Sequence, residues 1–157
     1  MKILIAYYSR TGITKKVALL ISKKLKAQCD EIIDKKDRSG ALGWIIAGKD
    51  ATQKRTTEIN HKKNPKNYDM IIIGGPVWSW DVTPAIRTYV TNNKKSLKAT
   101  RVAFFATQGS SGAETKFESM RKILGKKPIA TMTINGKDFK DEEYKKKIDE
   151  FITTVNF

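Results

Sequence analysis

Short apolar runs without polar interruptions recur along this chain, and they limit the folds that it can adopt. Ile3 to Tyr7 and Met70 to Ile73 are the clearest examples, and Arg101 to Ala106 is a third. A strand buried on both faces reads as a continuous apolar run, because neither of its faces is turned to water. These runs therefore predict the central strands of a parallel sheet. Two weaker strands are expected at Glu31 to Asp34 and at Pro128 to Ile134.

Amphipathic segments fill the spaces between these runs. Thr14 to Lys26 and Glu114 to Leu124 place apolar residues at helical spacing, and a last helix is expected from about Asp141. Thr83 followed by Pro84 is a typical helix start, since proline is favoured at the first helical position. Strands that alternate with helices predict an α/β fold. We expect a doubly wound, five-stranded parallel sheet of order 2-1-3-4-5 with helices on both faces.

The turn between the first strand and the first helix is rich in hydroxyl groups. Its residues are Ser9, Arg10, Thr11, Gly12, Ile13 and Thr14. The first N–H groups of a helix lack backbone partners, and their dipoles favour an anion. Neither G-x-x-x-x-G-K-[ST] nor G-x-G-x-x-G stands here, so the turn is not typical of a nucleoside triphosphate or dinucleotide site. It predicts a site for one phosphate monoester, with an ordinary capped turn as the alternative interpretation.

The segment after the third strand brings two tryptophans to the same edge of the sheet. Its residues are Pro76, Val77, Trp78, Ser79 and Trp80, preceded by Gly74 and Gly75. Large aromatic side chains are costly to leave in water, and a flat ligand that stacks on them removes that cost. We expect Trp78 to stack on a planar ligand. For Trp80, ligand contact and packing onto the core remain equal alternatives.

A third loop follows the fourth strand and is made of small polar residues. Thr107, Gln108, Gly109, Ser110 and Gly112 offer polar groups and backbone amides to the edge of a heterocycle. Taken alone, this loop could equally be a plain turn. Because the carboxyl ends of parallel strands meet at one edge of a sheet, the three loops are expected to converge on one ligand.

The chain carries a formal net charge of +15, from 31 Lys and Arg against 16 Asp and Glu. Such a charge attracts acidic partners and nucleic acid. The lysines fall as scattered pairs without interleaved aromatic residues, which favours solvated helix faces over a nucleic-acid interface. Nucleic acid is therefore not an expected partner.

The remaining composition is typical of a cytoplasmic protein. Cys29 is the single cysteine, so no internal disulfide is possible, and a reducing compartment is expected. The apolar runs are much shorter than the roughly 20 residues that span a bilayer. Residues 1–157 are expected to form one domain, because this length suits one hydrophobic core.

Taken together, these stretches resemble the flavodoxin family, and in particular a short-chain flavodoxin. The matching stretches are Ser9 to Thr14, Gly75 to Trp80 and Thr107 to Gly112, and the order of elements agrees along essentially the whole chain. The resemblance implies FMN as the cofactor. Its phosphate would lie on Ser9 to Thr14 and its isoalloxazine between residues 76–81 and 107–112. The implied function is electron transfer between redox partners, in which no amino acid acts as acid or base.

Two other interpretations stay open. An NAD(P)H-dependent quinone or FMN reductase uses the same scaffold and would be an enzyme rather than a carrier. A flavin-free phospho-receiver would need an aspartate at the end of the third strand, where Gly74 and Gly75 stand. The receiver interpretation is therefore disfavoured.

The positive charge departs from the family, whose carriers are commonly acidic. It implies redox partners that are acidic at the docking surface. The fully reduced flavin is an anion, which nearby carboxylates disfavour. Asp81 and Glu114 are the carboxylates expected near the loops. Because only two carboxylates are expected near the loops, we expect the second one-electron potential of the flavin to be less negative than in acidic carriers.

The segment 35–67 is the second departure. Ala41 to Lys49 is a candidate short helix, and for its Trp44 core packing is favoured over shielding of the flavin or of a partner site. His61, the only histidine, is expected in a solvated loop, and Cys29 is expected to be packed. No metal site is expected, since these two residues lack companion ligands.

Overall fold

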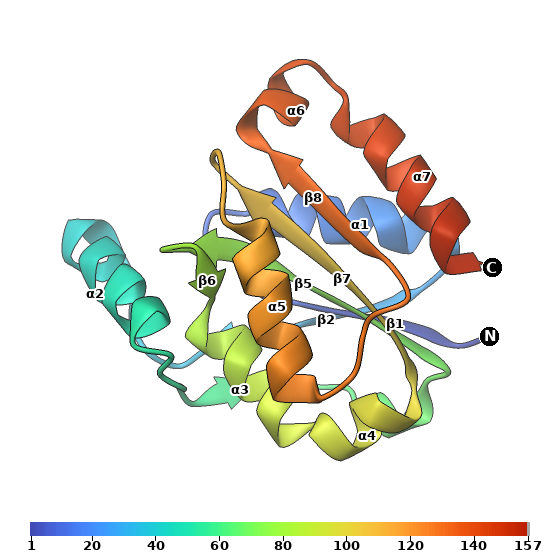
Figure 1. Ribbon diagram of the computed structural model, residues 1–157, viewed down its shortest axis with the longest axis horizontal. Helices are drawn as coiled ribbons and strands as arrows, with labels where there is room; N and C mark the ends of the chain where they lie inside the picture. Colours follow the sequence, from blue (N-terminus) through green and yellow to red (C-terminus); the bar gives the residue numbers. More distant parts are fainter. Residues whose placement is uncertain (157) are drawn as a thin grey trace.

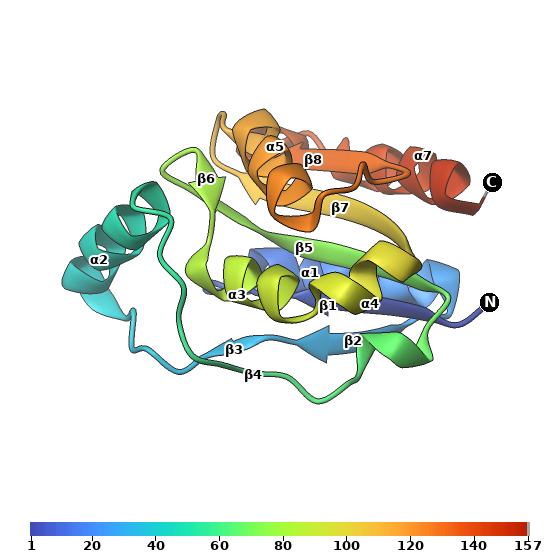
Figure 2. The same ribbon diagram turned by 60° about the horizontal axis from the view of Figure 1, so that its bottom comes forward.

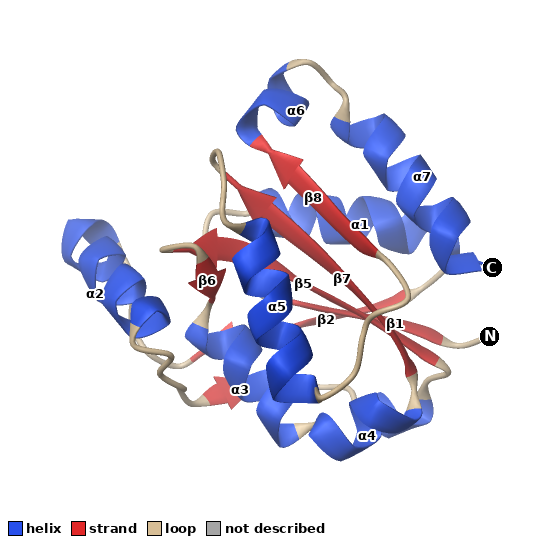
Figure 3. Cartoon of the chain, viewed as in Figure 1, coloured by secondary structure: helices blue, strands red, loops and turns tan. Residues whose placement is uncertain are grey.

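The computed structural model describes residues 1–156. A mostly parallel sheet with strand order β2-β1-β5-β7-β8 forms its centre (Figures 1 and 3). This is the predicted 2-1-3-4-5 order, so the expected fold class is confirmed. Its strands are β1 (Ile3–Tyr7), β2 (Gln28–Glu31), β5 (Met70–Trp78), β7 (Arg101–Gln108) and β8 (Thr131–Asn135). The short strands are β6 (Asp81–Val82), antiparallel to β5, and the separate pair β3 (Ile33–Asp34) and β4 (Ile59–Asn60).

Helices cover both faces of the sheet, as the two views together make clear (Figure 2). α1 (Ile13–Leu25) and α7 (Tyr144–Asn156) pack on one face, and α3 (Pro84–Asn92) and α5 (Ala113–Leu124) pack on the other. The remaining helices are α2 (Gly40–Thr52), α4 (Lys94–Ala99), α6 (Gly136–Lys140) and a 3₁₀ turn at Pro65–Asn67.

The core explains why the apolar runs are continuous. Along β5, Ile71 and Ile73 join the cluster under α3 and α5, while Met70 and Ile72 join the cluster under α1 and α7. All four side chains are fully buried. Successive strand residues point to opposite faces, so a strand with a helical layer on each side must be apolar at every position.

Some element boundaries differ from the prediction. The second strand of the central sheet is β2, which starts at Gln28. The predicted Glu31 to Asp34 begins at the last residue of β2 and ends in β3. β2 is an edge strand with polar side chains, so its apolar pattern is too weak to place it. β8 starts at Thr131 instead of Pro128, and α7 starts at Tyr144, after the unpredicted helix α6.

The segment 35–67 folds around α2, which extends the predicted short helix. In Figures 1 and 2, α2 lies at the end of the molecule toward which the arrows of β5 and β7 point, away from both termini. Its Leu42, Trp44 and Ile45 are 75%, 58% and 68% exposed, so the favoured core packing of Trp44 is wrong. The inward side of α2 carries small residues instead, and a Cβ on Gly43 would overlap the backbone of Arg38. Because α2 approaches the Arg38 backbone so closely, its large apolar side chains point outward.

His61 is more enclosed than the solvated loop that was expected. Its ring meets that of Tyr89 edge-on, with 5.0 Å between centres, and its Nδ1 lies 3.1 Å from the Lys63 carbonyl oxygen. Cys29 is half-buried, and burial raises the pKa of its thiol. Among residues 1–156, no helix is both long and apolar enough to cross a membrane.

Candidate functional site

A cavity of about 370 Å³ opens at the carboxyl edge of the sheet, where the three predicted loops meet. The register of the strands explains this convergence, because Tyr7 pairs with Gly74 and Pro76 pairs with Thr107. The volume is typical of small-molecule sites. The predicted residues that line it are Arg10, Thr11, Ile13, Thr14, Pro76, Val77, Trp78, Thr107, Gln108 and Gly109. The predicted residues outside its lining are Ser9, Gly12, Ser79, Trp80, Ser110 and Gly112.

Ser9 organises the turn before α1. Its Oγ accepts hydrogen bonds from the N–H groups of Gly12 and Lys15, each at 3.2 Å. Gly12 has a φ of 92°, in the left-handed region that favours glycine. The first turn of α1 carries no acidic residue, and a Cβ on Gly12 would meet no atom within 4 Å. The turn therefore leaves space for an anion beside the positive end of the helix dipole.

Arg10 ties this turn to α2. Its guanidinium donates to the backbone carbonyls of Arg38 and Gly40, the second at 3.3 Å, and lies 4.3 Å from the centre of the Trp44 ring. Arg10 is thus held by neighbouring segments and does not extend freely into solvent. The contact also brings Trp44 into the cavity wall.

The two tryptophans differ in their exposure. Trp78 is 6% exposed, meets Tyr8 edge-on at 5.5 Å between ring centres and lines the cavity, so its stacking on a planar ligand stays a prediction. Trp80 is 64% exposed, and its Nε1–H donates to Ser111 Oγ at 3.0 Å. The cause is a hairpin: β5 continues through Trp78, and Ser79 and Trp80 form its tip with φ values of 46° and 60°.

The third loop is held by its own side chains. Gln108 Oε1 accepts from the N–H of Ala113 at 2.9 Å, and Gln108 Nε2 donates to the Ser110 carbonyl at 3.3 Å. Thr107 Oγ1 lies 2.7 Å from the buried Thr14 Oγ1, which joins the first and third loops. The two loops are therefore braced before any ligand enters.

Three lining residues lie outside the predicted loops: Trp44, Gly136 and Phe139. The last two belong to α6, which begins with a capping box between Asn135 and Asp138. An asparagine followed three residues later by an acidic residue is a recognisable helix start, so this signal was present in the sequence.

The carboxylates expected near the loops lie elsewhere. Asp81 is buried, where it accepts from the N–H of Val82 at 2.6 Å and lies 3.4 Å from Arg87. Glu114 has a side chain that is 88% exposed and pairs weakly with Arg121. In the described part of the chain, the cavity lining contains no acidic side chain. Within residues 1–156, the cavity lining therefore carries no negative side chain that would repel an anionic ligand.

Sequence reasoning also missed Lys116, although its spacing, three residues after Ala113 and four before Met120, places it on the apolar face of α5. Lys116 is fully buried on α5, and its Nζ donates to the backbone carbonyls of Gly75 and, at 3.2 Å, Pro76. Burial lowers the pKa of Lys116 to about 7, although the charge of Asp81 acts in the opposite direction.

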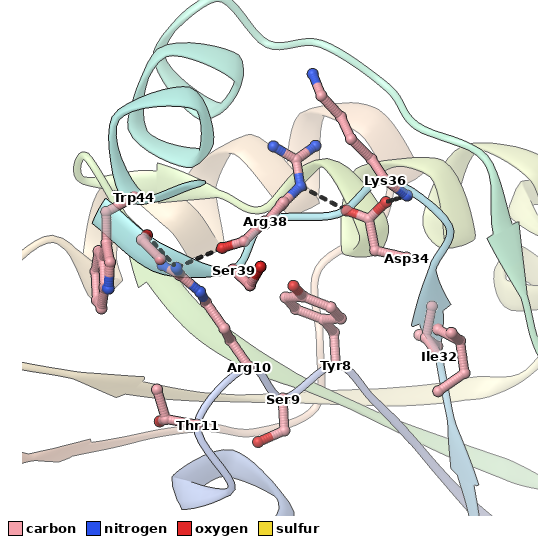
Figure 4. Close-up of a pocket in the computed structure, with 12 residues that line it drawn as sticks. Tyr8, Ser9, Arg10, Thr11, Ile32, Asp34, Lys36, Arg38, Ser39 and Trp44 are labelled. Carbon is pink, nitrogen blue, oxygen red and sulfur yellow. Dashed lines mark hydrogen bonds and ion pairs between the residues drawn. The ribbon is translucent and has the colours of Figure 1, made fainter. Parts of the chain in front are cut away.

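A second hollow of about 430 Å³ borders the same turn (Figure 4). Arg10, Thr11 and Trp44 line both spaces, and Tyr8 and Asp34 belong to the second alone. Burial, with the charge of Asp34, raises the pKa of Tyr8 to about 12, so its hydroxyl keeps its proton at neutral pH. Because this hollow lacks the second and third loops, the first cavity is the candidate site.

Comparisons with known proteins agree with the fold. A family model described as Flavodoxin matches residues 2–155. A flavoprotein from Lactobacillus acidophilus NCFM, solved in complex with FMN, is 27% identical, with a TM-score of 0.73 and coverage of 92% of this chain and 98% of its own. A protein from Bacteroides eggerthii DSM 20697 is 25% identical, with a TM-score of 0.76 and coverage of 96% and 97%.

More distant structures share the fold alone. Flavodoxin 2 from Bacillus cereus is 22% identical to this chain, with a TM-score of 0.58 and coverage of 98% and 97%. A search of curated proteins gives no significant match.

Proposed function

Because the chain belongs to the flavodoxin family, we propose that it binds FMN in the cavity at the carboxyl edge and carries electrons between redox partners. The observation that carries this proposal is one cavity lined by three separate loops. One of these loops is suited to a phosphate and the other two to a flat ring. The similar Lactobacillus acidophilus flavoprotein was solved with FMN, which supports the same cofactor here.

Each part of the cavity has a distinct task in this proposal. The turn from Ser9 to Thr14 holds the phosphate with backbone N–H groups and the Thr11 hydroxyl. Val77 and Trp78 on one side and Gly109 on the other enclose the ring. Bound FMN supplies the redox chemistry, so no side chain is needed as acid or base.

The first experiment is the visible spectrum of the purified protein, followed by FMN titration of the flavin-free form. We expect a yellow protein, or micromolar or tighter binding of added FMN measured by quenching of flavin fluorescence. Riboflavin, which lacks the phosphate, is the matched control ligand. Loss of the charge-assisted bonds to the phosphate should weaken binding by about 100-fold. A colourless protein that binds neither ligand would exclude this function.

A second experiment separates a carrier from a reductase. NADPH is added alone to the FMN-loaded protein under anaerobic conditions, and absorbance near the flavin maximum is followed. A carrier keeps its oxidised absorbance, because it takes electrons from a redox partner. Rapid bleaching would instead identify an NAD(P)H-dependent quinone or FMN reductase on the same fold.

Acidic partner proteins are part of the proposal. The chain has a net charge of +15, and complementary charge steers diffusional encounter between redox proteins.

A further inference from the structure

Lys116 is the one lysine that is fully buried in the described part of the chain, where other lysines lie on solvated faces. Removing an ammonium from water is costly unless an ion pair or several hydrogen bonds replace the lost hydration. Lys116 occupies an inward position of α5, and its Nζ reaches Gly75 and Pro76 of β5. Because burying the Lys116 ammonium is costly, its contacts must replace the lost hydration.

Its contacts are to backbone rather than to a carboxylate. Nζ donates to the carbonyls of Gly75 and Pro76 at the end of β5. The nearby Asp81 is engaged with Val82 N–H and Arg87. No ion pair joins Lys116 to an acidic group within residues 1–156. The positive charge on its ammonium is therefore only partly compensated locally.

The geometry places this charge directly behind the cavity wall. Pro76 and Val77 line the cavity, while Lys116 lies behind them, outside the lining. Gly75 is required for this arrangement, because a Cβ there would lie 3.3 Å from Lys116 Nζ and 2.9 Å from Ile86 Cγ1. In such a water-excluded place a charge acts over several ångströms with little screening.

We propose that Lys116 is a positioning residue of the flavin site that holds the Gly75 and Pro76 carbonyls toward α5 and favours the reduced, anionic form of the cofactor. Two effects act in the same direction. The carbonyl oxygens, which carry partial negative charge, are held toward the ammonium, and the ammonium itself attracts the negative charge that two-electron reduction leaves on the ring. Beside that negative charge Lys116 keeps its proton, because an opposite charge raises its pKa above the value of about 7 that burial sets. This inference rests on the proposed function.

The test compares binding of oxidised and reduced FMN to the flavin-free forms of the wild type and of four variants. Lys116→Met removes charge and donors at similar volume, which buried ion positions commonly tolerate. Lys116→Gln removes the charge but keeps an N–H donor. Lys116→Arg keeps both. Lys122→Gln is the matched control, since Lys122 is on the same helix with a side chain that is 76% exposed.

We expect both neutral variants to weaken binding of reduced FMN about tenfold more than binding of oxidised FMN. By the thermodynamic cycle, this tenfold difference equals about 30 mV for a two-electron couple. Lys116→Arg should restore the wild-type ratio, and Lys122→Gln should leave it unchanged. A purely structural Lys116 would change both affinities equally and leave the ratio constant.

The possible outcomes are distinct. An unchanged ratio in the neutral variants, or an equal change in Lys122→Gln, would overturn the role of Lys116 while leaving the proposed function intact. Failure of both neutral variants to fold would also overturn the positioning role of Lys116 and leave the proposed function intact, because Lys116 would then be a structural residue. Failure of the wild-type protein to bind FMN in either state would overturn the proposed function, and the inference with it.

Discussion

Gly74 shows how a single missing side chain shapes the sheet. It lies on β5 where β5 pairs with β7, and Phe105 lies directly beside it. A Cβ on Gly74 would overlap the fully buried Phe105 ring. The glycine therefore makes room for an aromatic side chain just below the cavity.

Gly74→Ala should destabilise the flavin-free protein by about 1–3 kcal/mol, because the added methyl group overpacks the core. Urea unfolding followed by far-UV circular dichroism measures the change. Gly109→Ala is the matched control, since its Cβ would meet no atom within 4 Å, and its change should stay within about 0.5 kcal/mol. Equal effects for the two variants would contradict this account of Gly74.

Lys116 should also make stability depend on pH. Burial lowers the pKa of Lys116 from 10.5 to about 7, so between these values the unfolded chain binds more protons than the folded one. Its contribution to the free energy of unfolding should therefore increase as pH rises from about 7 to about 10. Urea unfolding of wild type and Lys116→Met across this range measures the difference. A difference that is constant with pH would show that the pKa of Lys116 is not lowered.

At the scale of elements, α2 is attached to the body of the protein by a buried ion network. Arg38 Nε lies 2.7 Å from Asp34, and Arg38 Nη1 lies 2.8 Å from Asp50, with all three side chains at most 4% exposed. Lys36 adds a contact of 2.8 Å to Asp50. The network therefore joins Asp50 of α2 to Asp34 of β3 through Arg38.

Asp50→Ala should cost about 3–5 kcal/mol of stability, because it leaves the buried Arg38 guanidinium with incomplete charge compensation. Asp149→Ala serves as the comparison, since it breaks an exposed pair with Lys24 and should cost less than about 1 kcal/mol. Both are measured by urea unfolding. A cost for Asp50→Ala as small as that for Asp149→Ala would mean that the network does not hold α2 in place.

At the scale of the whole molecule, the charge of +15 should control encounter with redox partners. Dithionite-reduced, FMN-loaded protein is mixed with ferricyanide, an anion, or with hexaammineruthenium(III), a cation, in a stopped-flow instrument. Raising the ionic strength from about 20 to about 500 mM should slow the ferricyanide reaction at least about tenfold. The ruthenium reaction should become faster. The same salt dependence for both reagents would exclude steering by the net charge.

The same charge, together with the lining that holds no carboxylate, should affect the flavin potential. We expect the second one-electron potential to be less negative than in acidic flavodoxins, because the reduced anion meets little repulsion. A potentiometric titration at neutral pH measures it. A value as negative as those of acidic carriers would contradict this expectation.

Local patterning was sufficient for the fold and for the convergence of the three loops on one edge of the sheet. Continuous apolar runs such as Met70 to Ile73 require a helical layer on each face, and parallel strands bring the turns after β1, β5 and β7 to one edge. These features depend on residues that are close together in the sequence. The bounds of the edge strand β2 were predicted three residues too late, because an edge position does not require apolar residues on both faces.

The individual roles of side chains came from packing between distant segments. Trp78 is buried because it is the last residue of β5, which runs past the expected end of the strand, and Trp80 is exposed because it lies at the tip of the β5–β6 hairpin with a φ of 60°. Arg10 meets α2, and Lys116 meets the carbonyl groups of β5, across about 30 and 40 positions of the chain. Sequence periodicity reports which face of an element is apolar, but only packing in three dimensions sets which groups meet across such separations.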